Sequence, residues 1–179
     1  MAGGNLFLVG MMGAGKTTLG KALAQRVGLE FVDTDRVLVE RTGVPVATIF
    51  EIEGEAGFRR RESGVIAELA RGPRRVVATG GGAILAEDNR RVMRAAGTVI
   101  YLRARLEALW ERTRHDSSRP LLATPDPRAT LARLLEERDP LYREAAHLIV
   151  ETGSQSAGTL VNRVMAALRQ LPPAEESAR

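Results

Sequence analysis

The sequence has 179 residues, of which 44 % are hydrophobic and 27 % are charged, proportions that fit one folded globular domain. It contains no cysteine, which excludes a disulfide framework and a cysteine-based metal site. The apolar run at residues 6–9 is too short for a signal peptide, and no stretch approaches the roughly 18 apolar residues of a membrane span. We therefore expect a soluble, cytoplasmic protein without a membrane partner.

The formal net charge is +4, and almost all of the positive charge is arginine, since Lys16 and Lys21 are the only lysines. An arginine excess is compatible with nucleic-acid binding, with anionic ligands, or with a codon bias toward arginine. Acidic residues are interspersed among the arginines, which is typical of a solvated surface. Aromatic residues make up only 4 % of the chain, so a basic patch interleaved with aromatics is not present, and we expect no nucleic-acid partner.

In chain order, the first half predicts a strand at residues 6–9, a helix at 19–27, a strand at 31–32 and a helix at 58–69. Gly28 is well placed to end the first of these helices, because glycine commonly follows the last helical residue. Gly72 and Pro73 stop the second. The first half thus reads as two strand–helix units.

The second half predicts strands at 76–78, 99–102 and 147–150, with helices around 92–93, from 127 and through 160–168. Residues 112–124 are polar and lack a period, so we expect a long loop there. Asp126 and Pro127 predict a helix start, with aspartate as the cap. Five strands alternating with helices predict an α/β domain with a mainly parallel sheet, over residues 1–171, and a disordered tail at 172–179.

The strongest motif follows the first predicted strand directly, where residues 10–17 read GMMGAGKT and satisfy the Walker A pattern. The next helix starts directly after it, so backbone N–H groups and the helix N-terminus converge on bound phosphates. We expect Lys16 to reach the β- and γ-phosphates, and Thr17 to coordinate magnesium. The ATP-binding residues predicted here are Gly13, Ala14, Gly15, Lys16, Thr17 and Thr18. The alternative is a chance glycine-rich turn.

Two carboxylates follow the second predicted strand, at Asp33 and Asp35. P-loop enzymes commonly supply a carboxylate for magnesium at the end of another strand, so Asp33 is the candidate, acting through water. Asp35 lies nearer the acceptor, where a carboxylate can orient or deprotonate an attacking hydroxyl. The alternative is that both merely cap the next helix.

Further motifs follow along the chain. In order they are Asp33-Thr34-Asp35, Ile49-Phe50, Gly54-Glu55, Phe58-Arg59 with Glu62, Gly80-Gly81-Gly82, Arg119-Pro120-Leu121-Leu122, and Arg138 with Tyr142. Together with the Walker A run, this order resembles the shikimate kinase family over almost the whole chain, from about residue 5 to about residue 168. The Walker A run alone is shared by many families, whereas the combination is far more discriminating.

The resemblance implies a P-loop kinase with a five-stranded parallel sheet, an acceptor-binding flap at about 33–62 and a mobile lid at about 112–124. Shikimate would be held by Asp35, Arg59, Gly80, Gly81, Gly82 and Arg138. Two guanidinium groups suit a carboxylate, and Asp35 suits hydroxyls. We expect Glu62, one turn after Arg59, to brace that guanidinium. The alternatives are that Arg59 belongs to a solvated run and that the glycines form a simple turn.

The resemblance also gives Arg119, on the lid, a place at the γ-phosphate, and puts Arg112 and Gln155 beside the adenine. A lid that excludes water prevents ATP hydrolysis, and its arginine neutralises charge. The alternative for either arginine is solvated loop charge.

The implied reaction is transfer of the γ-phosphoryl of Mg-ATP to the 3-hydroxyl of shikimate, a step of aromatic amino-acid biosynthesis. Lys16, Asp35 and Arg119 would carry catalysis, Mg²⁺ would be the cofactor, and ATP and shikimate would be the small-molecule partners of a monomer. Rival interpretations are another small-acceptor P-loop kinase, such as a gluconate or nucleoside monophosphate kinase, a nucleotide-gated nucleic-acid binder, and a catalytically silent P-loop regulator.

Overall fold

A parallel sheet forms the centre of the computed structural model, which describes residues 4–116 and 119–171. The five strands are β1 (Asn5–Val9), β2 (Glu30–Asp33), β3 (Arg75–Ala78), β4 (Gly97–Ala104) and β5 (Leu148–Thr152). They lie in the order β2-β3-β1-β4-β5, and every neighbouring pair is parallel. The α/β fold predicted from the alternation of strands and helices is confirmed.

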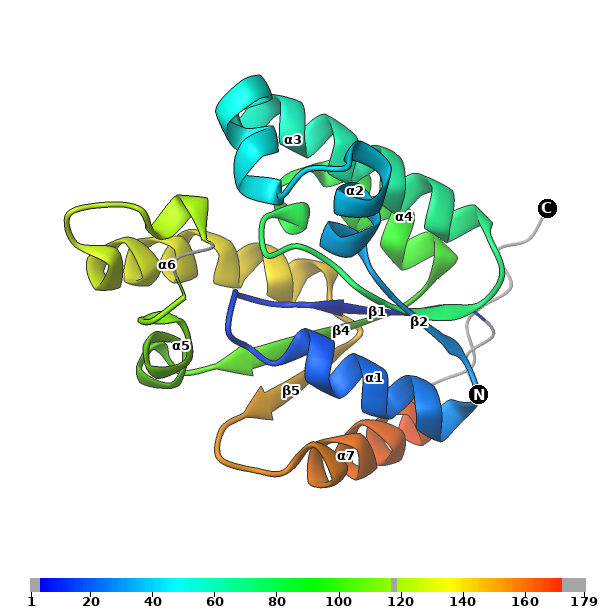
Figure 1. The fold of residues 1–179 in the computed structure, drawn as a ribbon. Helices are drawn as coiled ribbons and strands as arrows, with labels where there is room; N and C mark the ends of the chain where they lie inside the picture. Colours follow the sequence, from blue (N-terminus) through cyan, green and yellow to red (C-terminus); the bar gives the residue numbers. More distant parts are fainter. Residues whose placement is uncertain (1–3, 117–118, 172–179) are drawn as a thin grey trace.

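Helices cover both faces of this sheet (Figure 1). Helices α1 (Lys16–Val27) and α7 (Ala157–Gln170) pack together on one face. The other face carries α3 (Val46–Arg71), α4 (Glu87–Ala96) and α6 (Pro127–Ala145), while α2 (Thr34–Thr42) packs on α3. Strand β1 is buried along its whole length, as expected for an inner strand covered from both sides. No helix within 4–116 and 119–171 is long and apolar enough to cross a membrane.

The helix ends follow the local chemistry predicted for them. Gly28 ends α1 in the left-handed conformation, at φ 68°, and its N–H bonds the carbonyl of Ala24. The carboxylate of Asp126 accepts a hydrogen bond from the N–H of Ala129, and Pro127 is the first residue of α6.

The region expected to be one long loop is more ordered than predicted. Helix α5 (Leu106–Thr113) includes Arg112, and the short helix η2 (Pro120–Leu122) lies further along. Helix α5 buries only Leu109 and Thr113, so its apolar face is too thin to stand out among its charged neighbours. The prediction of a loop beginning at 112 was therefore wrong. Residues 117–118 of the predicted lid, and the tail at 172–179, lie outside the described residues.

The carboxyl ends of β1, β2 and β3 are adjacent, because these strands are neighbours and run in the same direction. The Walker A run follows β1, Asp33 ends β2, and Gly80 to Gly82 follow β3. The sheet therefore brings three motifs that are far apart in sequence to one edge, which is where ligands bind in open α/β sheets.

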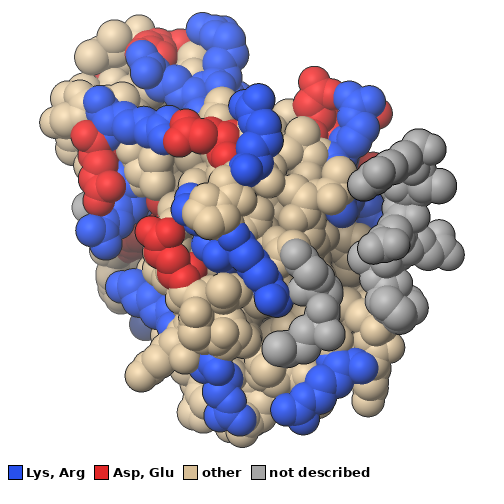
Figure 2. Space-filling model, turned by 90° about the vertical axis from the view of Figure 1, so that its right-hand side faces the viewer, with Lys and Arg blue, Asp and Glu red and all other residues tan. Residues whose placement is uncertain are grey.

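Charged side chains are spread over the surface. On the face drawn in Figure 2, basic side chains are separated by acidic and uncharged ones. Many arginines form ion pairs with nearby carboxylates, such as Arg41 with Glu68 at 2.7 Å and Arg61 with Glu53 at 2.7 Å. This distribution matches the solvated surface that the interspersed charges indicate.

Candidate active site

A pocket of about 690 Å³ opens at the carboxyl edge of the sheet. The residues lining it that the sequence singles out are Gly13, Gly15, Lys16, Thr17, Thr18, Asp33, Asp35, Arg59, Gly80, Gly81, Gly82, Arg112, Arg119 and Arg138. Apolar side chains from α2 and α3, including Val39, Val46 and Phe50, line the same pocket. The fold thus joins the phosphate motif and the acceptor motifs in one cavity.

The Walker A loop is held in conformations that favour glycine, with φ of 146° at Gly10 and 79° at Gly13. The ammonium group of Lys16 donates to the carbonyl oxygens of Gly10 at 2.7 Å and Met11 at 2.9 Å. Burial lowers the pKa of Lys16 to about 8, while the charge of Asp35 opposes this shift. The ammonium group of Lys16 therefore lies inside the phosphate loop and is hydrogen-bonded to the backbone of that loop.

Thr17 and Asp33 meet directly, since the threonine hydroxyl donates to Asp33 Oδ2 at 2.9 Å. The other oxygen, Oδ1, accepts from the backbone N–H groups of Asp35 at 3.0 Å and Arg36 at 3.4 Å. Asp33 is thus also the N-cap of α2, a helix that the sequence did not single out. Asp33 caps the helix with Oδ1 and bonds Thr17 with Oδ2, so the two interpretations, as cap and as pocket carboxylate, are compatible.

A hydroxyl and a carboxylate beside a phosphate loop form a donor set that suits Mg²⁺, which keeps several waters and binds one or two protein oxygens plus phosphates. Within the described residues there is no cluster of three or more histidine, cysteine or acidic side chains that could hold a metal by itself. The arrangement of Thr17 and Asp33 fits a metal shared with a nucleotide.

Arg138, on α6, is 2 % exposed, yet its Nε and Nη1 have no hydrogen-bond partner. The same is true of two buried carboxylate oxygens, Asp35 Oδ1 and Glu62 Oε1. Buried polar groups in folded proteins are almost always paired, so groups left unpaired beside a pocket indicate a ligand that pairs with them. Burial, followed by the charge of Asp33, raises the pKa of Asp35.

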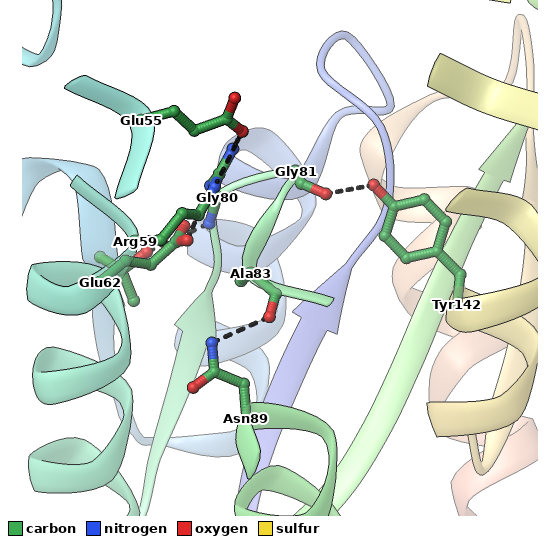
Figure 3. Close-up of polar contacts among 9 residues, drawn as sticks. Glu55, Arg59, Glu62, Gly80, Gly81, Ala83, Asn89 and Tyr142 are labelled. Atoms are coloured by element: carbon green, nitrogen blue, oxygen red, sulfur yellow. Dashed lines mark hydrogen bonds and ion pairs between the residues drawn. The ribbon is translucent and has the colours of Figure 1, made fainter. Parts of the chain in front are cut away.

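Arg59 is held between two carboxylates of its own helix (Figure 3). Its Nη1 donates to Glu62 at 2.7 Å, and its Nη2 donates to Glu55 at 3.2 Å. The guanidinium also lies 5.2 Å from the centre of the Phe58 ring. Glu62 is fully buried, and burial raises its pKa, which the charge of Arg59 opposes. The expected brace of Arg59 by Glu62 is confirmed, and Arg59 is not part of a solvated run.

The glycine segment after β3 is fixed at three backbone positions. The N–H of Gly80 donates to the Thr34 hydroxyl at 3.2 Å, the Tyr142 hydroxyl donates to the carbonyl of Gly81 at 2.5 Å, and the Asn89 amide donates to the carbonyl of Ala83 at 2.9 Å. The last two contacts are drawn in Figure 3. A side-chain carbon on Gly80 would collide with Glu62, so glycine is required there by close approach. The segment is more than a turn between two elements.

The remaining predicted residues lie around the phosphate loop. Arg119 lines the pocket, and its Nε donates to Asp116 at 2.8 Å. Arg112 donates from Nη1 to the carbonyl of Gly13 at 2.9 Å and from Nη2 to that of Gly153 at 2.6 Å.

Two of the predicted residues do not line this pocket. Ala14 is buried, with its carbonyl 3.3 Å from the Thr152 hydroxyl that donates to it. Gln155 accepts from the N–H of Gly153 at 2.8 Å and lines a second hollow together with Gly153.

Comparison with known proteins agrees with this geometry. A family model described as shikimate kinase matches residues 12–169. A shikimate kinase of Nitrosospira multiformis is 58 % identical over 87 % of this chain and 80 % of its own length. One of Chromobacterium violaceum is 56 % identical over 94 % and 92 %. A shikimate kinase of Acinetobacter baumannii, solved in complex with shikimate, superimposes with a TM-score of 0.91 at 44 % identity, covering 94 % of this chain and 96 % of that one.

The chain belongs to the shikimate kinase family. It is therefore an ATP-dependent phosphotransferase, and the interpretation as a catalytically silent regulator is not supported.

Sequence reasoning missed several residues of this shikimate kinase site. Tyr142 was noted as part of a motif but given no task, and Asn89, Thr34 and Asp116 were not considered as site residues. Each acts on a functional residue through a hydrogen bond. Asp116, three residues before Arg119, carried a local signal, since an i,i+3 pair of opposite charges commonly interacts. The others contact residues between 6 and 61 positions away, and no local pattern predicts such contacts.

Proposed function

We propose that the pocket binds Mg-ATP and shikimate side by side and transfers the γ-phosphoryl group to the 3-hydroxyl, giving shikimate 3-phosphate and ADP. The two substrates would occupy opposite ends of one cavity, with the phosphate loop at one end and Arg59 and Arg138 at the other. We expect the chain to act as a cytoplasmic monomer.

On the donor side, the Walker A backbone would hold the phosphates. Lys16 would exchange its bonds to the carbonyls of Gly10 and Met11 for the β- and γ-phosphate oxygens. Arg119 would neutralise charge on the γ-phosphate. Two observations support this role: the side chain lines the pocket, and a hydrogen bond from its Nε to Asp116 orients the guanidinium. Arg112 is joined to both Gly13 and Gly153, which supports a place beside the nucleotide base.

Thr17 and Asp33 would hold Mg²⁺, Asp33 through water. When bound, the ion supplies charge neutralisation across the phosphate oxygens. The direct bond between the two side chains, at 2.9 Å, supports this pairing, because it puts both oxygens beside the phosphate loop.

The observation that carries the acceptor assignment is the buried Arg138 with two unpaired N–H groups. An arginine fork buried this deeply requires an anion of matching shape, and a carboxylate provides two oxygens for it. Arg59, oriented by Glu62 and Glu55, would add a second guanidinium. Gly80, Gly81 and Gly82 would bring backbone close to the ring of the acceptor.

Asp35 would act on the hydroxyl that attacks phosphorus. Its Oδ1 has no partner in the free protein and can accept the proton as the new O–P bond forms and the bond to the leaving ADP oxygen breaks. The raised pKa of Asp35, caused first by burial, makes it a better proton acceptor than an ordinary aspartate. Positioning and charge neutralisation supply the rest of the rate.

An assay with purified protein, Mg-ATP and shikimate, read by product mass, tests the proposal. One phosphoryl group should be gained by shikimate, and ADP release should be small without the acceptor. Gluconate and nucleoside monophosphates serve as rival acceptors in the same assay. Faster turnover of any of these, or no mass gain on shikimate, would contradict the assignment.

A further inference from the structure

Tyr142 is fully buried, and its hydroxyl points to the backbone of Gly81 (Figure 3). It lies on α6, and its hydroxyl donates to the carbonyl of Gly81 at 2.5 Å. The same hydroxyl lies 3.6 Å from the sulfur of Met11, in the phosphate loop. Burial raises the pKa of this tyrosine, so its hydroxyl stays protonated and available as a donor.

Gly81 lies between the two ends of the pocket. A side-chain carbon on this residue would lie 3.5 Å from Nη1 of Arg138, 3.5 Å from the carbonyl oxygen of Gly10 and 3.5 Å from the N atom of Met12. The backbone of Gly81 therefore lies next to the guanidinium that faces the acceptor and next to the loop that faces ATP, separated from each by about the width of a side-chain carbon. A small displacement of this backbone changes the shape of the acceptor end directly.

Tyr142 and Arg138 are one turn apart on the same face of α6, four residues from each other. The hydroxyl bond thus ties the glycine segment to the helix that carries Arg138. Within the glycine segment, Asn89 fixes the carbonyl of Ala83 two residues further on. Of the bonds that hold this segment, the one from Tyr142 joins the Gly81 backbone to the helix that carries Arg138, whereas Thr34 and Asn89 hold Gly80 and Ala83.

We propose that Tyr142 is a positioning residue that sets the affinity for the acceptor by fixing the Gly81 backbone against Arg138. This inference rests on the proposed function, since it names what the acceptor end of that pocket depends on. Tyr142 itself does not line the pocket, so it acts through its two pocket-lining neighbours, the Gly81 backbone and the Arg138 guanidinium. Removing its hydroxyl leaves the carbonyl of Gly81 without its buried donor, and the segment then moves to find another.

Tyr101 provides a matched control. It is buried on β4 and stacks on Tyr142, with ring centres 4.8 Å apart and ring planes at 23°. Its hydroxyl also makes one hydrogen bond, at 2.7 Å, but to the carboxylate of Asp139, which does not line the pocket. Tyr101→Phe and Tyr142→Phe thus remove the same atom from the same aromatic pair, and only the second loses a bond to the glycine segment.

The experiment measures steady-state kinetics for both substrates in wild type, Tyr142→Phe and Tyr101→Phe, with folding checked by circular dichroism and thermal melting. We expect Tyr142→Phe to raise the KM for shikimate by roughly tenfold, as loss of one buried donor implies, with the KM for ATP within about twofold of wild type. Tyr101→Phe should leave both KM values within about twofold of wild type. It should lower the melting temperature by about as much as Tyr142→Phe does. Calorimetric titration with shikimate should show the same loss of affinity.

The proposal is overturned if Tyr142→Phe leaves the KM for shikimate unchanged, if Tyr101→Phe raises it equally, or if the KM for ATP rises in parallel. Should Tyr142→Phe fail to fold, Asn89→Leu tests the same claim from the other anchor of the segment. It should raise the KM for shikimate severalfold and spare that for ATP, and no change would overturn the proposal. Wild-type activity on shikimate is measured first, so failure of the proposed function is seen separately.

Discussion

The two ends of the pocket differ in how their polar groups are satisfied in the free protein. At the phosphate end, Lys16 bonds the carbonyls of Gly10 and Met11, and Thr17 bonds Asp33. At the acceptor end, Arg138 keeps two buried N–H groups without a partner, and Asp35 and Glu62 each keep one unpaired oxygen.

This difference separates the roles of the two ends. ATP must replace hydrogen bonds that the phosphate end already makes, so each exchange contributes little net binding energy, and charge there serves the transition state. A polar acceptor instead pairs groups that are costly to leave buried and unpaired, each by about 1–3 kcal/mol. Substitutions at the phosphate end should therefore mainly lower kcat. Substitutions of the acceptor-end arginines should mainly raise the KM for shikimate, whereas Asp35, which acts on the proton, should affect kcat.

Lys16→Met gives the largest expected effect. It removes a positive charge from the transferring phosphoryl group, so we expect kcat to fall on the order of 10³-fold, as loss of such electrostatic stabilisation implies. Lys21→Met, at the exposed lysine of the same helix, is the control and should retain activity. Steady-state ADP release measures both. A Lys16→Met enzyme with near-normal kcat and a raised KM for ATP would break the comparison, because the lysine would then serve ground-state binding.

Arg138→Lys tests the acceptor end. Lysine keeps the charge but loses the planar fork, so the KM for shikimate should rise roughly 30-fold, with a much smaller change in the KM for ATP. Arg133→Lys is the control, since Arg133 is on the same helix but exposed and paired with Glu137 at 2.8 Å. Equal loss of kcat and of affinity in Arg138→Lys would show that the unpaired guanidinium serves the transition state instead.

Asp33→Asn separates the two tasks of Asp33. Asparagine is an equally good helix cap, so stability should change by less than about 0.5 kcal/mol, whereas the concentration of Mg²⁺ needed for half-maximal rate should rise roughly tenfold. Asp126→Asn makes the same change at the cap of α6, which does not line the pocket, and should leave the magnesium dependence unchanged. A magnesium titration of ADP release checks both, and identical curves would contradict a metal role for Asp33.

The fold could be predicted from the sequence for those helices and strands that are rich in apolar residues. Strands β1 and β4 and helix α1 have such patterns, and Gly28 and Pro127 mark boundaries by their own chemistry. Helices α2 and α5 were missed; both are short, and each contributes a single apolar side chain to the core, Leu38 and Leu109. For these, contact with the rest of the fold, rather than their own periodicity, determines the helix.

Individual site residues could be predicted only because the motifs that contain them indicate a chemical role. The Walker A run, Asp35 and Arg138 were all identified, and all but Ala14 and Gln155 of the predicted binding residues line one pocket. What could not be predicted is pairing across the fold, such as Tyr142 with Gly81, which depends on how α6 packs against the segment that follows β3. The bonds of Lys16 to the carbonyls of Gly10 and Met11 were equally hidden, since no sequence pattern reports them.

The pH dependence gives the smallest expected effect and separates the two ends most directly. Burial lowers the pKa of Lys16 to about 8 in the free protein, so this lysine is charged below that pH and increasingly neutral above it. Because kcat/KM for ATP at saturating shikimate reports the enzyme without bound nucleotide, it should fall about fourfold between pH 7 and 8.5. In contrast, kcat/KM for shikimate at saturating ATP should fall much less, because bound phosphates restore the charged lysine. Equal alkaline losses for the two substrates would place the titrating group outside the phosphate end, and the comparison between the ends would fail.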